Sequence, residues 1–274
     1  MYGRFFYQDS DIFCHHTLDL RPNPADFPMH AHETMELMYF ISISGAYMVE
    51  GTQYDLRPGD ILVLRSAEAH KLLLSPGEAY DRIAIRFSAS LFSALDPEGQ
   101  LLRPFLYHPL GQLNLYRQAH FASPHWQSAF KDFDMDAHDA GEVRLHILSR
   151  LFPILVELNK AYARRPDKQE STDQPLSARL VAYVNSHLFE NLSLERISGA
   201  FFISKSQTNR IFSQATGSSV WKYVLIKRLL AARARIQNGE PANKVSAACG
   251  FREYSAFYRA YRARFGCAPK NDAR

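Results

Sequence analysis

The 274-residue chain contains little cysteine, no long apolar run and little net charge. Cys14, Cys249 and Cys267 are too few and too far apart for a disulfide framework or a CxxC metal motif. No apolar run approaches the roughly 18–20 residues of a membrane-spanning helix, and the first residues do not form a secretory signal. These absences predict a reduced, cytoplasmic protein without a membrane partner.

Two common kinds of catalytic motif are missing as well. The chain has no glycine-rich phosphate loop and no nucleophile with a matching base and acid. We therefore expect no enzyme. An apolar content of 46% and a charged content of 22% exclude a disordered or fibrous chain, and the length favours two domains.

The net charge of +4 conceals a strong asymmetry. Residues 1–174 hold 16 basic and 23 acidic side chains, a net charge of −7, whereas residues 175–274 hold 16 basic and 5 acidic ones, a net charge of +11. A basic domain of this size is typical of proteins that bind the phosphate backbone of nucleic acids. The opposite signs also predict that the acidic part docks on the basic part when DNA is not bound.

A polar stretch separates these two parts. Residues 164–175, RRPDKQESTDQP, contain no large apolar side chain and two prolines, so this segment cannot bury enough surface to fold. We predict an N-terminal domain at residues 1–163, a linker at 164–175 and a C-terminal domain at 176–274.

The N-terminal part is predicted to be an antiparallel β-sandwich or barrel. Short runs that favour strands, separated by turn signals, lie at residues 36–43, 46–50, 52–56, 61–64 and 82–87. Because side chains alternate along a strand, Met38 and Phe40 share a face with Glu36, and Val49 shares a face with Tyr47. We predict a small-molecule pocket lined by His32, Glu36, Met38, Phe40, Tyr47, Val49 and His70. The alternative is that these side chains only fill the core.

His30 and His32 form an HxH pair, Glu36 follows four residues later, and His70 lies beyond a Pro-Gly-Asp turn. This arrangement resembles the two motifs of the cupin barrel, and the resemblance implies that the four residues match the three His and one Glu that hold a divalent ion in metal-containing cupins. Imidazole and carboxylate groups suit Fe, Mn, Ni or Zn. The alternative is that the HxH pair lies in a loop and that the other two residues form hydrogen bonds near the pocket.

A leucine stripe follows in a helix that is predicted to begin near Glu142, with Pro153 as a kink or boundary. Such a stripe either packs on the barrel or contacts a second subunit. We expect a dimer interface formed by Leu145, Leu148, Leu151, Leu155 and Leu158.

The C-terminal part is predicted to contain two helix-turn-helix units. A helix over residues 204–216 begins at the N-cap Ser204 and stops at Gly217, and a second over about 254–265 also stops at a glycine. The basic helix between them, residues 219–238, spans roughly 28 Å. This separation suits two helices that enter successive major grooves, about 34 Å apart.

Both parts resemble the AraC family of transcription regulators. The run FPMHAHETMELMYFISISGAYMVEGTQYDLRPGDILVLRSAEAHKL is similar to the cupin-like sensor of that family. The runs LSLERISGAFFISKSQTNRIFSQATGSSVWKYVLIKRLLAARARI and KVSAACGFREYSAFYRAYRARFGCAP are similar to its double helix-turn-helix. Ser198, Ser246 and Thr208 depart from the usual Ala, Ala and Leu, which is tolerable where the hydroxyl bonds back to the preceding turn.

The resemblance implies an α+β two-domain fold, with a cupin-like antiparallel β-barrel and helices followed by an all-α tandem helix-turn-helix. It implies a ligand-responsive, sequence-specific transcription regulator that senses a sugar or related metabolite. The implied partners are double-stranded promoter DNA, the effector, a second subunit and, for an activator, RNA polymerase.

The resemblance also bears on the histidines. In such sensors a similar HxH pattern usually marks the barrel mouth without a bound metal, so we expect no metal and no cofactor. The alternative is a metal-dependent cupin enzyme fused to a DNA-binding domain, with its metal held by His30, His32, Glu36 and His70.

Positions that match the family's base-contacting residues are Ser206, Asn209, Arg210, Tyr254, Ser255, Tyr258 and Arg259. Arg suits pairing with guanine and Asn with adenine. Phosphate contacts are expected from Lys205, Lys222, Lys244, Arg252 and Arg262. The alternative for each residue is a solvated helix face.

Overall fold

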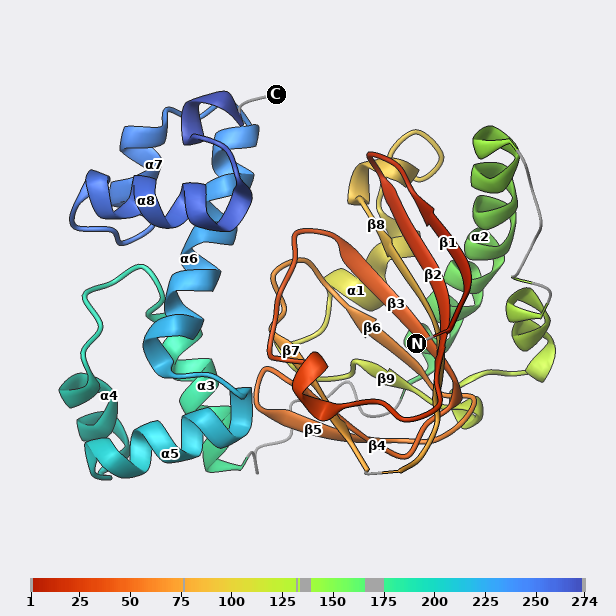
Figure 1. The fold of residues 1–274 in the computed structure, drawn as a ribbon, viewed down its shortest axis with the longest axis horizontal. Coiled ribbons are helices and arrows are strands. Elements are labelled where there is room, and N and C mark those ends of the chain that lie inside the picture. Colours follow the sequence, from red (N-terminus) through yellow and green to blue (C-terminus); the bar gives the residue numbers. More distant parts are fainter. Residues whose placement is uncertain (1, 76, 132, 134–138, 166–174, 273–274) are drawn as a thin grey trace.

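A computed structural model describes residues 2–75, 77–131, 133, 139–165 and 175–272. It consists of a β-rich N-terminal domain and a helical C-terminal domain (Figure 1). Most of the predicted linker, residues 166–174, lies outside the described residues. In the described part, no helix combines the length and the apolar character that crossing a membrane requires.

The N-terminal domain is built from two antiparallel sheets that face each other. The larger sheet has the order β1-β2-β8-β3-β6-β9 and the smaller one β5-β4-β7. The strands are β1 (Tyr2–Gln8), β2 (Ile12–Asp19), β3 (Met35–Ser42), β4 (Gly45–Val49), β5 (Thr52–Leu56), β6 (Ile61–Leu64), β7 (His70–Leu74), β8 (Tyr80–Phe87) and β9 (Leu115–Tyr116). The predicted strands are therefore present, whereas β1, β2, β7 and β9 were not predicted.

The alternation predicted for β3 is confirmed. Met38 and Phe40 point between the two sheets and pack with Tyr47 in one core, whereas Met35 and Leu37 belong to a second core on the outer face of the larger sheet. Both faces of this sheet are therefore covered. The covering segments are η2 (Ala89–Phe92), η3 (Gln100–Leu102), α1 (Arg103–Leu106), η4 (Gln118–His120), η5 (Pro124–Phe130) and α2 (Ala140–Arg164). The short η1 (Pro24–Asp26) lies beside β7 of the smaller sheet instead.

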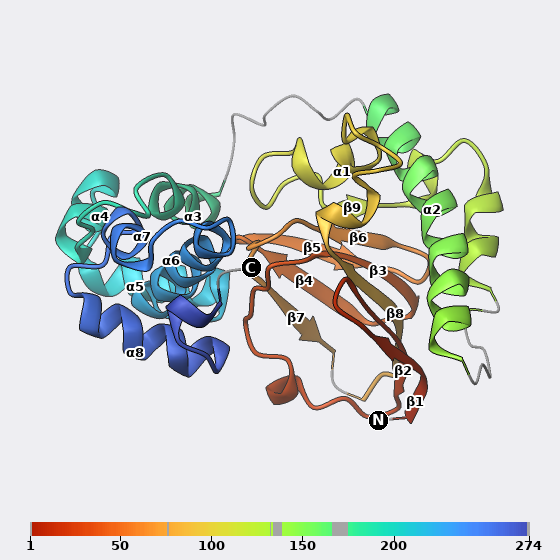
Figure 2. The same ribbon diagram turned by 90° about the horizontal axis from the view of Figure 1, so that it is seen from above.

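Helix α2 corrects part of the predicted dimer interface. Leu151, Leu155 and Leu158 are completely buried in the core between α2 and the larger sheet, so they are not available to a second subunit. Leu148 is partly buried against the same core, and Leu145 is 69% exposed. The 3.6-residue period identified the helix correctly, but this stripe faces the barrel. Figure 2 shows α2 on the side of the barrel opposite the helical domain.

The helical domain follows the predicted repeat closely. Its elements are α3 (Leu176–Ser186), α4 (Leu194–Phe201), α5 (Lys205–Thr216), α6 (Val220–Gln237), α7 (Ala242–Ala248), α8 (Tyr254–Phe265) and η7 (Pro269–Asn271). Ser204 caps α5 in a reciprocal capping box with Gln207. Gly217 and Gly266 end α5 and α8 in the left-handed region, with φ values of 71° and 75°.

Three hydroxyl residues that depart from the family pattern are buried in the helix pairs. Ser198, Thr208 and Ser246 each donate a hydrogen bond to a carbonyl three or four residues earlier, at 3.2, 3.0 and 2.9 Å. These bonds satisfy polar groups that would otherwise be unpaired inside the fold.

The two domains pack directly on each other. Met29, Ala31 and Ala69, from loops at one end of the barrel, belong to the same apolar cluster as residues of α3, α5 and α6. We call this end of the barrel, formed by residues 29–34, 50–51 and 66–70, the barrel mouth. The helical domain therefore covers the mouth, as Figure 1 shows.

Candidate functional site

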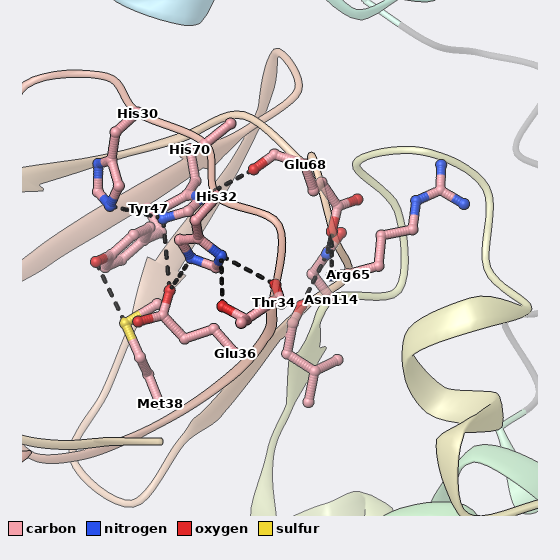
Figure 3. Close-up of polar contacts among 12 residues, drawn as sticks. His30, His32, Thr34, Glu36, Met38, Tyr47, Arg65, Glu68, His70 and Asn114 are labelled. Atoms are coloured by element: carbon pink, nitrogen blue, oxygen red, sulfur yellow. Dashed lines mark hydrogen bonds and ion pairs between the residues drawn. The ribbon is translucent and has the colours of Figure 1, made fainter. Parts of the chain in front are cut away.

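The three histidines and the glutamate converge at the barrel mouth (Figure 3). His30 and His32 precede β3, Glu36 lies on β3, and His70 begins β7, where its backbone pairs with that of His30. Glu36 Oε2 lies 2.9 Å from His32 Nε2 and 3.5 Å from His70 Nε2. His70 Nε2 lies 3.0 Å from His30 Nε2. We call these four residues the histidine cluster.

Burial controls the charge of this cluster. It lowers the pKa of His70 to about 3, because an imidazolium loses its hydration there. Burial raises the pKa of Glu36, but its interaction with His32, together with a smaller one with Arg86, outweighs this, so the net pKa is below the usual value. Glu36 therefore stays a carboxylate beside neutral His70.

The remaining predicted pocket residues lie behind the cluster, between the sheets. Met38, Phe40, Tyr47 and Val49 are all at most 5% exposed. The Tyr47 hydroxyl donates to Met38 Sδ at 3.3 Å, and its ring lies 6.1 Å from that of His70. These four side chains thus fill the core between the sheets, which is the alternative considered from the sequence. Of the seven predicted pocket residues, His32 alone lines the cavity described next.

A cavity of about 380 Å³ lies where the barrel meets the helical domain. His32, Glu33 and Thr34 line it from the mouth loop, and Arg86 lines it from β8. The β1–β2 hairpin and helices α6 and α8 complete the walls, with Gln8, Asp9, Asp11, Leu230, Arg233, Arg264 and Phe265 among the lining residues. Its walls are therefore mostly polar and come from both domains.

Glu50 joins the domains through a buried carboxylate. It is 4% exposed and lies in the β4–β5 turn with φ of 47°. Its Oε1 accepts hydrogen bonds from Lys227 Nζ at 2.7 Å and from Ala69 N at 2.6 Å. Its Oε2 accepts from Asn185 Nδ2 at 3.2 Å and from the Tyr223 hydroxyl. Three of these four donors belong to the helical domain.

The partners of Glu50 are held in donating states. Burial and the Glu50 carboxylate raise the pKa of Tyr223 well above its usual value, so its hydroxyl keeps the proton that it donates. Lys227, 7% exposed, also donates to Ala67 O at 2.5 Å. The buried charges are thus paired and hydrogen-bonded, as burial requires.

Two arginines of the helical domain contact the loop that carries the histidines. Arg264, near the end of α8, donates to Ala31 O at 2.8 Å, and Ala31 separates His30 from His32. Arg233, on α6, lies 3.1 Å from Glu33 Oε2. This pair and Lys227–Glu50 place opposite charges against each other where the two domains meet.

The individual residues that form these domain contacts were not predicted from the sequence. A glutamate beside a glycine in a turn ordinarily faces solvent, so nothing in the sequence indicated that Glu50 is buried. The burial of Lys227 was weakly indicated, because this residue lies four residues after Tyr223 and one after Ile226, on an otherwise buried side of α6. A lysine at such a position points to a buried partner.

The predicted base-contacting residues lie on α5 and α8. Arg210 and Ser206 are exposed on α5, and Arg259 and Tyr254 are exposed on α8. Asn209 and Tyr258 are half-buried, and Ser255 is exposed. The predicted phosphate contacts Lys205, Lys222, Lys244, Arg252 and Arg262 are all exposed. Lys205 forms an ion pair with Glu195, and Arg252 donates to Asn191, so both are oriented by α4 and the loop before it.

Family models match both domains. Residues 18–149 match an AraC-like ligand-binding domain, and residues 197–274 match a helix-turn-helix domain. The first match includes the histidine cluster and Glu50, and the second includes α5 to α8.

Individual proteins are also similar to this chain. The transcriptional activator RhaS of Escherichia fergusonii is 24% identical over 264 residues, which is 89% of this chain and 86% of RhaS. The probable transcriptional regulator LumQ of Photobacterium leiognathi is 33% identical over 88 residues, 32% of this chain and 36% of LumQ. The crystal structure of ToxT from Vibrio cholerae aligns over 96% of this chain and 97% of its own, with 11% identity and a TM-score of 0.38. On the two family models and the full-length similarity to an activator, the chain belongs to the AraC family: it is a transcription regulator with a ligand-binding domain and a helix-turn-helix DNA-binding domain.

Proposed function

We propose that a small effector binds at the barrel mouth and thereby changes how the helical domain docks and binds promoter DNA. The observation that carries this proposal is the Glu50 carboxylate, which belongs to the barrel but takes three of its four hydrogen bonds from the helical domain. An effector that binds the docked and released arrangements with different affinity shifts the population between them.

The cavity between the domains supports a polar effector. Its lining includes Arg86, Arg233 and Arg264 together with His32 and acidic groups. Such groups form hydrogen bonds with hydroxyl or carboxylate groups, whereas an apolar molecule would leave them unpaired. A sugar or a related polar metabolite fits this chemistry.

A thermal-shift screen of polar metabolites tests the effector proposal. A molecule that binds only the native state raises its apparent stability. We expect hits on the wild-type chain that are weakened at least tenfold by Arg86→Gln, which removes a cavity charge. The matched control is Arg57→Gln, at an exposed turn position. The proposal fails if no metabolite stabilises the chain, or if the hits stabilise Arg86→Gln equally.

DNA reading is proposed for the exposed faces of α5 and α8. We retain the roles predicted above for the seven base-contacting residues and the five phosphate-contacting residues. Their placement on helices at the two ends of α6 supports this (Figure 1). We also propose the domain boundary within residues 164–175.

A homodimer remains a proposal, because the structure moves most of the predicted stripe into the core. The outer side of α2 offers Leu145 at 69% exposure and Phe152 at 39%, seven residues apart. Analytical ultracentrifugation of Leu145→Glu, with Lys160→Glu as an exposed control on the same helix, tests whether this side joins two chains. A dimer that persists in Leu145→Glu excludes it.

The names of the relatives support the remaining proposals. RhaS and RhaR are named transcriptional activators, which supports activation through contact with RNA polymerase. The same names support a cytoplasmic regulator rather than an enzyme.

A further inference from the structure

An open groove separates the two helix-turn-helix units of the helical domain. Its volume is about 670 Å³, and its walls come from the α3–α4 loop, from α6, and from the end of α7 with the turn that follows. Three of the side chains that line it are large, apolar and exposed: Phe189 at 48%, Trp221 at 44% and Leu225 at 40%. We call these three residues the apolar triad. Exposed apolar side chains that gather in one place, rimmed by polar groups, mark an interaction surface.

Helix α6 turns the triad away from the barrel. Trp221 and Leu225 lie four residues apart and therefore on one side of the helix. Lys227, which bonds to Glu50 of the barrel, follows Leu225 by two residues, a rotation of about 200°, and lies on the opposite side. All residues that line the groove belong to the helical domain. Docking on the barrel therefore leaves the groove open.

The helices assigned to DNA reading place a duplex on this same side. Gly217, which ends α5, lies so close to Lys71 of β7 that a Cβ atom on it would come within 2.6 Å of the lysine Cδ. Arg264, near the end of α8, donates to Ala31 O of the barrel mouth. Both helices thus end against the barrel and begin away from it (Figure 1). A recognition helix contacts base edges with its N-terminal residues, so the duplex lies on the side that is remote from the barrel.

Positive charge on the rim of the groove suits a phosphate backbone. Lys222, on α6, and Arg252, in the α7–α8 turn, are both exposed. Arg252 donates to Asn191 and so links the second unit to the loop that precedes the first. The Glu190 carboxylate at the rim forms an ion pair with Arg196 at 2.6 Å and is neutralised by it. The rim therefore attracts a polyanion, whereas the triad between its charges needs an apolar surface to cover it.

The floor of the groove fixes the distance between the two units. The Arg228 guanidinium donates to Leu188 O and Glu190 O beside the first unit, both at 2.8 Å, and to Gly250 O of the second at 2.6 Å. Gly250 has φ of 80°, and a Cβ atom on it would lie 2.7 Å from Phe189 O. So close an approach holds the units in one arrangement. A duplex that contacts both units must therefore adapt its own shape.

We propose that the apolar triad contacts the minor groove of the operator, midway between the two major grooves that α5 and α8 enter, and selects sequences that bend there. This inference rests on the DNA reading proposed above for α5 and α8. Two successive major grooves on one face of a duplex flank a minor groove, which therefore faces the triad. Apolar side chains in a minor groove bend DNA by wedging base steps apart, and pyrimidine–purine steps deform most easily. The centre of the operator thus contributes specificity through its flexibility, without a hydrogen bond to a base.

Selection from random DNA tests this with the full chain. From duplexes of about three helical turns, the wild type should recover two motifs one turn apart, with pyrimidine–purine steps enriched between them. Trp221→Ala/Leu225→Ala should recover the same two motifs without the enrichment. The matched control, Leu95→Ala, removes a leucine that is 73% exposed on the barrel domain, and it should behave like the wild type.

A pair of duplexes isolates the minor groove. Both carry the selected motifs, and their central steps contain either G·C or I·C pairs. Inosine keeps the major-groove edge of guanine and lacks only its minor-groove amino group. The wild type should bind the I·C duplex at least about threefold more tightly, because the missing amino group opens the floor of the minor groove and leaves a softer base pair. The double variant should bind both duplexes alike.

The outcomes separate this inference from the proposal on which it rests. If the wild type selects no paired motifs, DNA reading by α5 and α8 fails, and the central contact fails with it. If paired motifs appear but the wild type binds the G·C and I·C duplexes equally, or the double variant distinguishes them as the wild type does, only the central contact is overturned. The comparison of the two duplexes with the wild type needs no variant, so it decides even if Trp221→Ala/Leu225→Ala does not fold.

Discussion

The basic residues of the helical domain belong to two populations with different surroundings. Lys227, Arg233 and Arg264 face the barrel, where they bond to Glu50, Glu33 and the Ala31 carbonyl. A second set, which includes Arg210, Arg259 and Lys222, is exposed on α5, α8 and α6. The net charge of +11 on residues 175–274 is therefore divided between residues that contact the barrel and exposed residues, to which we assign DNA binding. Charge alone does not distinguish the two sets, whereas their contacts with the barrel do.

Among the substitutions compared in the two sets of basic residues, Lys227→Met should cause the largest loss of folding stability. Lys227→Met leaves the Glu50 carboxylate buried without its cation, and breaking a buried pair in this way costs about 3–5 kcal/mol. Urea unfolding should show this loss, whereas Lys222→Met, an exposed change on the same helix, should stay within about 0.5 kcal/mol. The double variant Glu50→Gln/Lys227→Met should recover part of the loss. Equal stability of Lys227→Met and Lys222→Met would mean that the Lys227–Glu50 pair does not stabilise the contact between the domains.

The exposed arginines should control discrimination between DNA sequences. Arg210→Ala and Arg259→Ala should each cost about 1–3 kcal/mol of binding to the specific site, and relax specificity there. Fluorescence anisotropy with specific and random duplexes measures both effects. An equal loss on the two duplexes would rule out a base-reading role for the arginine concerned.

The ion pair of Arg233 should contribute less to folding stability than that of Lys227, because Arg233 faces the barrel but is only partly buried. Its pair with Glu33 has side-chain exposures of 25% and 30%, so solvent screens it. A double-mutant cycle with Arg233→Ala and Glu33→Ala should give a coupling of about 0.2–1 kcal/mol that falls as salt is added. A coupling as large as that of Lys227 with Glu50 would contradict the ranking by burial.

The smallest effect on discrimination is expected at Lys222. Lys222→Ala should weaken binding to all duplexes alike and reduce the slope of log affinity against log salt by about 0.9. Affinity measured at several salt concentrations tests this. A change in the ratio of specific to random binding would instead place this lysine near a base.

Local signals in the sequence account for the features that were predicted well. The caps Ser204 and Gly217 identify α5 because helix ends depend on hydrogen bonds within a few residues. Alternation along β3 likewise places Glu36, Met38 and Phe40 on one face, as the structure confirms. The convergence of the histidine cluster was open in the sequence and is settled by the strand pairing of β3 and β7 with their neighbours.

Tertiary placement accounts for the features that were missed. The 3.6-residue period of α2 is the same whether its stripe faces a barrel or a second chain, so Leu151 and Leu155 were assigned to the wrong surface. The partners Glu50 and Lys227 are 177 residues apart, and no local pattern connects them. Strand β2 contains two adjacent histidines, His15 and His16, which weaken its apolar alternation.

The position of Ala31 has a thermodynamic consequence. Its neighbours His30 and His32 belong to the histidine cluster, while its own carbonyl accepts from Arg264 on α8. If α8 binds DNA and the barrel mouth binds an effector, as proposed above, both would act on this short loop. Linkage requires that the factor by which the effector changes DNA affinity equals the factor by which DNA changes the affinity for the effector. Under these proposals we expect operator DNA itself to act as an effector of the sensor, with an influence that is measurable as a change in effector affinity.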